Sequence, residues 1–317
     1  MQLTRRHRLA DWVMLLSLTL MWGTSFLLTK IAVGGFPPDL VVAGRLVLAT
    51  VLLVPTAWLL ATRPVAGRRL WVFYVLIAVF GNVLPFSLIA WGQTFIASGL
   101  AGILMAIMPL ATLGLAHFLV PGEHLTRYRA AGFVLGFAGV VVLLGPDAFA
   151  DLADGQGHLL PMLAVLGGAI SYAVSSILAR LRPASDALFS AASTISLASL
   201  MMVPVVVLTG DVAGDAAVRV APETPHLIAV ALLGVFATAI ATIVYFKLVK
   251  SAGPSFVSQL NYLIPLWAVG VGMLFLGEEP EPNHLYALGL ILCGILVTQL
   301  ERRGAAPARN SAPRRSR

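Results

Sequence analysis

The chain has 317 residues, of which 59% are hydrophobic and 11% are charged, and its mean hydropathy is +0.91. Soluble domains carry about 25% charged residues, so a water-soluble fold is excluded because it could not cover this much apolar surface. The formal charge of +7 does not indicate nucleic-acid binding, since the basic residues form no patch with interleaved aromatic residues. The composition therefore predicts an integral membrane protein.

Ten apolar segments of membrane-spanning length follow one another along the chain. They cover residues 11–33, 39–61, 70–91, 97–120, 129–146, 158–181, 186–209, 226–250, 255–276 and 283–300. Each has about 18–25 residues, enough for a helix that rises 1.5 Å per residue to cross a hydrocarbon layer of about 30 Å. We therefore predict an all-α integral membrane protein with ten transmembrane helices.

Lysine and arginine residues are concentrated in alternate gaps between these segments. Eighteen of the 21 fall in every second gap, as Arg5, Arg68, Arg127 and Arg180 do, whereas the opposite gaps contain only Arg219 and ten of the 14 acidic residues. The positive-inside rule then places both termini in the cytoplasm and the protein in the plasma (inner) membrane. The basic residues are expected to contact anionic lipid headgroups.

The remaining segments are short. Residues 1–10 are predicted to be a cytoplasmic N-terminal segment, and residues 146–157 an external linker. Residues 301–317 are rich in Ala, Pro, Ser and Arg, which is typical of a disordered tail, here basic and cytoplasmic. These loops leave no room for a soluble catalytic domain.

The two halves of the chain, residues 11–145 and 158–300, share short motifs in the same order. Pro109-Leu110 recurs as Pro265-Leu266, and Gly122-Glu123 recurs as Gly277-Glu278. Each half contains five segments, an odd number, so the second half must enter the membrane in the opposite orientation.

The charges agree with this orientation. Arg127 and Arg129 follow the first Gly-Glu pair, whereas only acidic residues follow the second. We therefore predict two inverted five-helix repeats. Such repeats build many secondary transporters and place the substrate at their interface near the middle of the membrane.

Several of these motifs also resemble a known family. Trp22-Gly23-Thr24-Ser25-Phe26 with Lys30, Pro37-Pro38 followed by Arg45, Ser98-Gly99 followed by Pro109, and Gly122-Glu123 are similar to the pattern of the drug/metabolite transporter superfamily in its EamA-type branch. The resemblance covers residues 11 to 300. In the second half the first-helix pattern is eroded, because Tyr172 through Arg180 contains no Trp-Gly pair. The resemblance implies a ten-helix permease or exporter of small metabolites, often amino acids, with a cavity lined mainly by helices 1, 3, 4, 6, 8 and 9.

Two basic residues, Lys30 and Arg45, lie inside predicted segments, where topology does not account for them. A cation within a span costs several kcal/mol unless it is paired, faces water or reaches the interface. In one interpretation, both attract a carboxylate or phosphate of the substrate in a wet vestibule. In the other, Lys30 extends to the outer interface, and Arg45 pairs with Asp39 or a backbone carbonyl.

Uncharged polar and aromatic residues within the segments are further candidates for binding the substrate. The amides are the strongest of them, because serine and threonine often bond their own helix. The candidates are Trp22, Asn82, Trp91, Tyr172, Ser175, Tyr245, Gln259 and Asn261.

Three prolines and three glycines within the segments carry predictions about the helices themselves. Proline removes a bond within a helix and bends it, so Pro85, Pro109 and Pro265 are candidate bends for gating. The glycines of the fifth segment have the spacing of close helix packing, which leaves a homodimer open as well as packing within the chain. These glycines are Gly132, Gly136 and Gly139.

Together these features predict a secondary transporter, an exporter of small metabolites. Amino acids or related zwitterions and anions are the expected substrates, moved by alternating access at the repeat interface. The acidic residues lie at the boundaries of the segments or in loops, which favours facilitated movement or exchange over ion coupling. The alternatives are a membrane-embedded enzyme and a polytopic membrane protein that does not transport. Because no catalytic or nucleotide-binding motif is apparent, we predict no enzymatic activity, cofactor or metal.

Overall fold

The computed structural model of the protein describes residues 8–60, 67–123, 126–144, 159–209 and 223–304, and all regular structure in these ranges is helical. The first half contains α1 (Leu9–Gly35), α2 (Pro38–Leu60), α3 (Arg68–Ala78), η1 (Val79–Val83), α4 (Leu84–Phe95), α5 (Ser98–Met105), α6 (Met108–Leu119) and α7 (Arg127–Leu144). The second half contains α9 (Leu159–Leu181), α10 (Ala187–Thr209), α11 (Thr224–Leu232), η3 (Leu233–Ile240), α12 (Ala241–Ala252), α13 (Pro254–Val257), α14 (Leu260–Leu276) and α15 (Pro282–Gly304).

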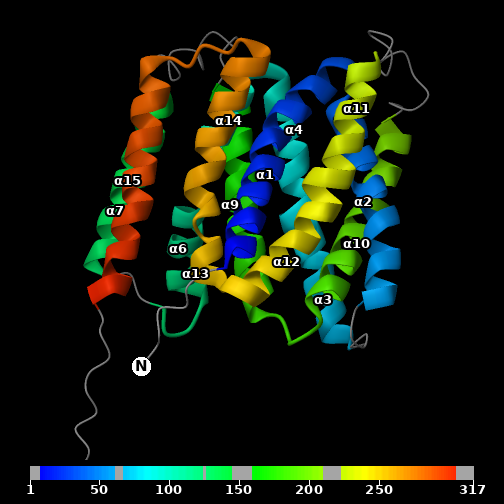
Figure 1. Ribbon diagram of the computed structural model, residues 1–317, viewed down its shortest axis with the longest axis horizontal. Coiled ribbons are helices and arrows are strands. Elements are labelled where there is room, and N and C mark those ends of the chain that lie inside the picture. Colours follow the sequence, from blue (N-terminus) through cyan, green and yellow to red (C-terminus); the bar gives the residue numbers. More distant parts are fainter. Residues whose placement is uncertain (1–7, 61–66, 124–125, 145–158, 210–222, 305–317) are drawn as a thin grey trace, which may run out of the picture.

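These helices make ten passes through the molecule, as the sequence predicts, and each begins and ends within a few residues of its predicted segment. Among the described residues, nine passes are long and apolar enough to cross a membrane by length and composition. The tenth is divided into the four-residue α13 and the 17-residue α14. Figure 1 shows the passes side by side, with the start of α1 and the end of α15 at the same end of the bundle.

The two ends of the bundle carry different charges. We call the end at which α1 begins the basic end, because it carries Arg68, Arg127, Arg180 and other basic residues at helix ends. The opposite end, where α2 and α15 begin, is called the acidic end and carries residues such as Glu278.

Four passes depart from a continuous α-helix. The third and the eighth contain the π-helical segments η1 and η3. In each, a polar side chain bonds the carbonyl five residues earlier, Asn82 to Ile77 at 3.4 Å and Thr238 to Leu233 at 2.8 Å. The fourth pass breaks between α5 and α6, and the ninth between α13 and α14. Because π-helical turns often occur at functional sites, η1 and η3 indicate that a site lies close to the third and eighth passes.

The three candidate bending prolines occupy different positions in their passes. Pro109 lies in the first turn of α6, where a missing N–H disrupts no helical hydrogen bond, whereas Pro85 lies in the first turn of α4, which continues η1 without a break. Pro265 lies in a helix interior, that of α14. In the third and fourth passes the irregularity therefore comes just before the proline, and a gating role for all three stays a prediction.

The glycines of α7 pack against α15 within the same chain. A Cβ at Gly294 of α15 would lie 2.6 Å from the Gly132 carbonyl oxygen and 2.9 Å from the Gly136 nitrogen. Gly139 is similarly close to the Ala287 carbonyl, at 3.0 Å. The packing interpretation of these glycines is confirmed, because their close approach joins α7 to α15 (Figure 1). A homodimer stays a prediction.

We expect Gly294→Ala to destabilise the protein, because the added methyl group meets backbone atoms that cannot rotate away. Overpacking of this kind costs about 1–3 kcal/mol, so the apparent Tm of the purified protein in detergent should fall by several degrees. Gly289→Ala in the same helix is the matched control, since a Cβ there has no neighbour within 4 Å. Equal melting temperatures for the two variants would contradict the prediction.

Candidate functional site

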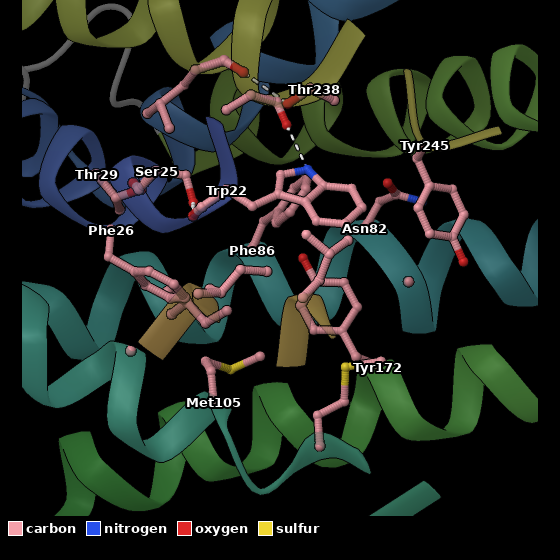
Figure 2. A pocket seen from close by; sticks show the side chains of 18 of the residues that line it. Trp22, Ser25, Phe26, Thr29, Asn82, Phe86, Met105, Tyr172, Thr238 and Tyr245 are labelled. Carbon is pink, nitrogen blue, oxygen red and sulfur yellow. Dashed lines mark hydrogen bonds between the residues drawn. The ribbon is translucent and has the colours of Figure 1, made fainter. Parts of the chain in front are cut away.

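A cavity of about 530 Å³ lies at the centre of the bundle and is lined by both halves of the chain. The polar residues that line it are Ser25, Thr29, Arg45, Asn82, Thr238, Thr242, Ser258 and Asn261. The aromatic residues that line it are Trp22, Phe26, Phe86, Tyr172 and Tyr245. Figure 2 shows several of these side chains facing one another across the cavity, among them Trp22, Asn82 and Tyr172. Cavities of 300–1,000 Å³ are typical of small-molecule sites.

The passes that line the cavity include all six that the family resemblance implies, namely the first, third, fourth, sixth, eighth and ninth. The second and seventh passes contribute as well. Val41, Val42 and Arg45 come from α2, and Ile195 comes from α10. The contribution of α2 is decisive for the chemistry, because it brings the cation.

Arg45 is the only Lys or Arg among the residues that line the cavity, and no Asp or Glu is among them. Its Nε donates a hydrogen bond of 2.7 Å to the Thr238 hydroxyl of η3, and its guanidinium carbon lies 3.8 Å from the centre of the Phe86 ring. In the described part of the chain, Arg45 makes no other side-chain hydrogen bond and no ion pair. Most of its donors are therefore available to a bound ligand.

The position of Arg45 follows from a close contact between α2 and η3. A Cβ at Gly234 would lie 3.0 Å from the Arg45 carbonyl oxygen and 2.6 Å from the Leu48 Cβ, so the two helices approach closely only because residue 234 is glycine. The Thr238 hydroxyl donates to the Leu233 carbonyl and accepts from Arg45, and both of its bonds fix the guanidinium. Among the described residues, the hydrogen-bond acceptor of the Arg45 side chain is the Thr238 hydroxyl, and neither Asp39 nor a backbone carbonyl takes that place.

Trp22 of α1 connects the two halves through the same segment, η3, that holds Arg45. Its Nε1 donates to the Ala237 carbonyl of η3 at 3.1 Å, and its ring lies 5.5 Å from that of Tyr245. A carbonyl in a π-helical segment is open to such a donor because the wide turn disturbs the regular bonding of the helix. Trp22 therefore presents a fixed aromatic face to the cavity.

The cavity brings together most of the site residues that the sequence predicts. Those that line it are Trp22, Arg45, Asn82, Tyr172, Tyr245 and Asn261, with Pro109 and Pro265 of the bending candidates. Those that do not line it are Lys30, Trp91, Ser175, Gln259 and Pro85.

The predicted residues outside the cavity have identifiable partners or positions. The Lys30 ammonium donates to the Gln93 carbonyl at 2.7 Å, near the end of α4. Trp91 packs against Phe95, with ring centroids 5.3 Å apart. Ser175 is buried against Gly81, and Gln259 precedes the first turn of α14. Lys30 therefore bonds backbone at the acidic end and does not face the cavity.

Sequence reasoning missed the apolar and smaller polar residues of the wall. Phe26 and Thr29 follow Trp22 at helical spacings of four and seven, and Phe86 follows Asn82 by four. Residues with these spacings share a helix face. The helical spacing from each polar candidate was therefore the signal in the sequence that could have identified these wall residues.

Asp11, an acidic residue at the start of α1, is buried. Asp11 lies at the start of α1, as expected from its position at a segment boundary, but only 6% of it is exposed. It accepts from the Arg8 backbone N–H at 2.9 Å and from the Ser251 hydroxyl of α12 at 2.8 Å. Its carboxylate therefore joins α1 to α12 at the basic end. In the ranges that the structure describes, no group of three or more His, Cys, Asp or Glu could hold a metal.

Comparison with known proteins gives a consistent set of relatives. The chain is similar to the uncharacterized transporter YvbV of Bacillus subtilis, at 26% identity over 90% of both chains. It is also similar to Protein PagO of Salmonella typhimurium, at 28% identity over 94% of this chain and 95% of that one. The uncharacterized inner membrane transporter YedA of Escherichia coli is 24% identical over 90% and 89% of the two chains.

A solved structure and a family model agree with these relatives. One crystal structure superimposes with a TM-score of 0.59 at 22% identity, covering 92% of this chain and 98% of the other, which supports the fold. The sequence model of the EamA-like transporter family matches residues 11–145 and again residues 159–300. Since these two matches cover most of the chain, the protein belongs to the EamA-like transporter family and is a multi-pass membrane transporter.

Proposed function

We propose that this protein carries small organic anions or zwitterions, with amino acids as the first expectation, by alternating access through the central cavity. The observation that carries this proposal is Arg45, a cation in the wall of the cavity with a single described hydrogen bond. The proposal contains no catalytic step.

Arg45 favours a substrate with a carboxylate or a similar oxyanion. A cation inside a membrane protein is costly unless it is paired or hydrated, and a guanidinium offers a planar pair of donors that fits a carboxylate. Because no acidic side chain is among the residues that line the cavity, a bound anion supplies the missing partner. The cavity suits an anion or a zwitterion better than a cation.

The rest of the cavity suits an amphipathic molecule. Trp22, Tyr172 and Tyr245 offer aromatic faces, and Asn82 and Asn261 offer amides that can both donate and accept. The combination of apolar walls with a few polar groups is typical of sites that bind small metabolites. We therefore expect a compact apolar or aromatic body attached to the anionic group.

Alternating access requires two halves that move relative to each other, and inverted repeats would supply them. The family model matches the chain twice, and the corresponding third and eighth passes both contain π-helical segments. Gly122 and Gly277, which precede the repeated glutamates, both have a positive φ, of 83° and 63°. These features support two inverted repeats, residues 11–145 and 158–300, with the cavity at their interface.

The direction and location belong to the same proposal. We place the basic end and both termini in the cytoplasm, because basic residues are retained on that side of a membrane. The name of YedA, an inner membrane transporter, supports a location in the plasma (inner) membrane. Export is the expected net direction. We expect facilitated movement or exchange, because the described residues that line the cavity include no acidic residue that could bind a coupling ion.

Solute counterflow in vesicles tests the function. Purified protein in liposomes loaded with an unlabelled solute should exchange it for labelled solute of the same class, with no ion gradient imposed. Matched solutes with one ring and different charge separate the possibilities: phenylacetate, phenylalanine and phenethylamine. We expect exchange of the first two and none of the cation. Failure of folded protein to exchange any anion or zwitterion of a broad panel would reject the proposal.

A further inference from the structure

The turn between α4 and α5 at the acidic end is held by opposite charges from two other helices. Lys30 of α1 donates to the Gln93 carbonyl in the last turn of α4, at 2.7 Å. The Glu278 carboxylate, which follows α14, accepts from the backbone N–H groups of Ser98 and Gly99 in the first turn of α5, at 2.6 and 2.8 Å. A cation therefore holds one side of the turn and an anion the other.

Each charge lies at the helix end that attracts it. The C-terminal end of a helix carries partial negative charge and the N-terminal end partial positive charge. Ala97 occupies the position that precedes α5 and has no side-chain acceptor, so Glu278 supplies from another part of the chain the cap that the local sequence lacks. The charge of Glu278 also acts on Lys30.

The carboxylate fits a space that only small residues leave. A Cβ at Gly99 would lie 3.2 Å from Glu278 Oε2, and a Cβ at Gly272 would collide with the same oxygen. Gly277, at φ 63°, turns the chain so that Glu278 can reach α5, and the Glu278 N–H bonds the Gly272 carbonyl at 3.2 Å. This is a built contact between α14 and α5.

The turn held in this way joins helices that form a buried part of the cavity wall, where Phe26 is 9% and Thr29 5% exposed. Gln93, which is fully buried, donates from its amide to the Phe26 carbonyl of α1 at 2.9 Å. Phe26, Thr29 and Gly102 line the cavity on the same elements, below the turn. The two charges therefore join α1, α4, α5 and the end of α14 beside this buried part of the wall.

The repeat-related residues at the basic end are arranged differently. Arg180 lies near the end of α9 as Lys30 lies near the end of α1, and Glu123 follows Gly122 as Glu278 follows Gly277. There the two side chains bond each other, Arg180 Nη2 to Glu123 Oε1, at 2.5 Å. Arg180 is 52% exposed, and Glu123 also pairs with Arg129, whose Nη1 lies 3.7 Å from Glu123 Oε2.

We propose that Lys30 and Glu278 form a charge clamp that holds the acidic end of the cavity shut, and that opening this end moves both side chains off the backbone and onto each other. In this proposal the released arrangement resembles the Arg180–Glu123 pair of the basic end. The inference rests on the alternating access of the proposed function, and it gives Lys30 and Glu278 the role of positioning residues, distinct from substrate binding.

Access to the cavity from the acidic end tests the clamp. The only cysteine, Cys293, is replaced by serine, and Thr29→Cys in the cavity wall provides a reporter. Its reaction with a membrane-impermeant thiol reagent is then followed from each side of the membrane. Glu278→Gln and Lys30→Met should each raise the rate from the acidic end about tenfold, the contribution of a charged hydrogen bond to an equilibrium. Glu279→Gln, an exposed neighbour, should leave the rate unchanged.

A charge exchange, Lys30→Glu combined with Glu278→Lys, separates the clamp from a simple ion pair. In this double variant each charge lies at the helix end that repels it, so the clamp predicts fast labelling of the cysteine at position 29 from the acidic end. If Lys30 and Glu278 only formed an ion pair with each other, the exchange would restore the slow labelling of the parent. Slow labelling of the double variant overturns the clamp. Labelling rates within twofold of the parent for both single variants also overturn it, when gel filtration shows that the protein is folded. If counterflow fails for every solute but the rates change as expected, the carrier function falls and the clamp stands.

Discussion

Arg45→Met is expected to lower counterflow of anionic and zwitterionic solutes by at least about hundredfold, the effect of losing two charged hydrogen bonds. The guanidinium is the only Lys or Arg side chain in the lining of the cavity, so no neighbour can replace it. Initial rates of exchange in proteoliposomes, at equal amounts of incorporated protein, measure the loss.

The stability of the same variant makes the prediction specific. An arginine with a single described hydrogen bond contributes little to folding, and replacing buried charges by apolar residues of similar size is often neutral or stabilising. The melting temperature of Arg45→Met should therefore equal or exceed that of the parent. Arg45→Lys keeps the charge without the planar fork and should retain partial exchange. Full exchange by a folded Arg45→Met variant would remove Arg45 from the site.

Trp22→Ala is expected to have the second-largest effect. The substitution removes an aromatic wall of the cavity and the hydrogen bond to the Ala237 carbonyl that fixes it. Truncation of a fully buried aromatic side chain costs about 3–5 kcal/mol of folding free energy, and the half-buried Trp22 should cost less. We expect at least a tenfold rise in the KM for counterflow together with a lower melting temperature.

Trp22→Phe is the matched control for this prediction. It keeps a ring against Tyr245 but cannot donate to Ala237, so its KM should lie between those of the parent and Trp22→Ala. A KM for Trp22→Phe as high as that for Trp22→Ala would assign the effect to the hydrogen bond and contradict a stacking role.

The ten passes could be predicted because hydropathy and charge act over whole segments. An apolar run of about twenty residues has few alternatives in a lipid bilayer, and the alternation of basic gaps fixes the order of the passes. The π-helical turns within the third and eighth passes were not predicted. A π-helical turn differs from an α-helical one by a single residue, and nothing in the sequence of Leu233–Ile240 marks it.

The site was predicted in part, and the two cations show why. Lys30 and Arg45 look alike in sequence, since both are basic and lie inside apolar segments near the same end. Their roles diverge through local geometry. Lys30 lies about one turn from the end of α1 and reaches the last turn of α4, whereas Arg45 lies about two turns into α2 and meets η3 in the cavity wall.

The aromatic wall of the cavity was also predicted only in part, because helix packing decides which aromatic residues face the cavity. Phe26 and Phe86 read as ordinary apolar residues, and only the partner helices turn their faces into a cavity lining. Trp91 and Ser175 carry the right chemistry on faces that pack elsewhere.

The contact between α7 and α15 has a consequence for biogenesis. The glycine face of α7 is covered by α15, which leaves the ribosome after every helix between them. During synthesis this face must therefore remain in contact with lipid or with an insertion factor until α15 has been made. A chain that is cut short before Pro282 lacks the partner of α7 altogether, which gives quality-control proteases a recognisable mark of incomplete synthesis.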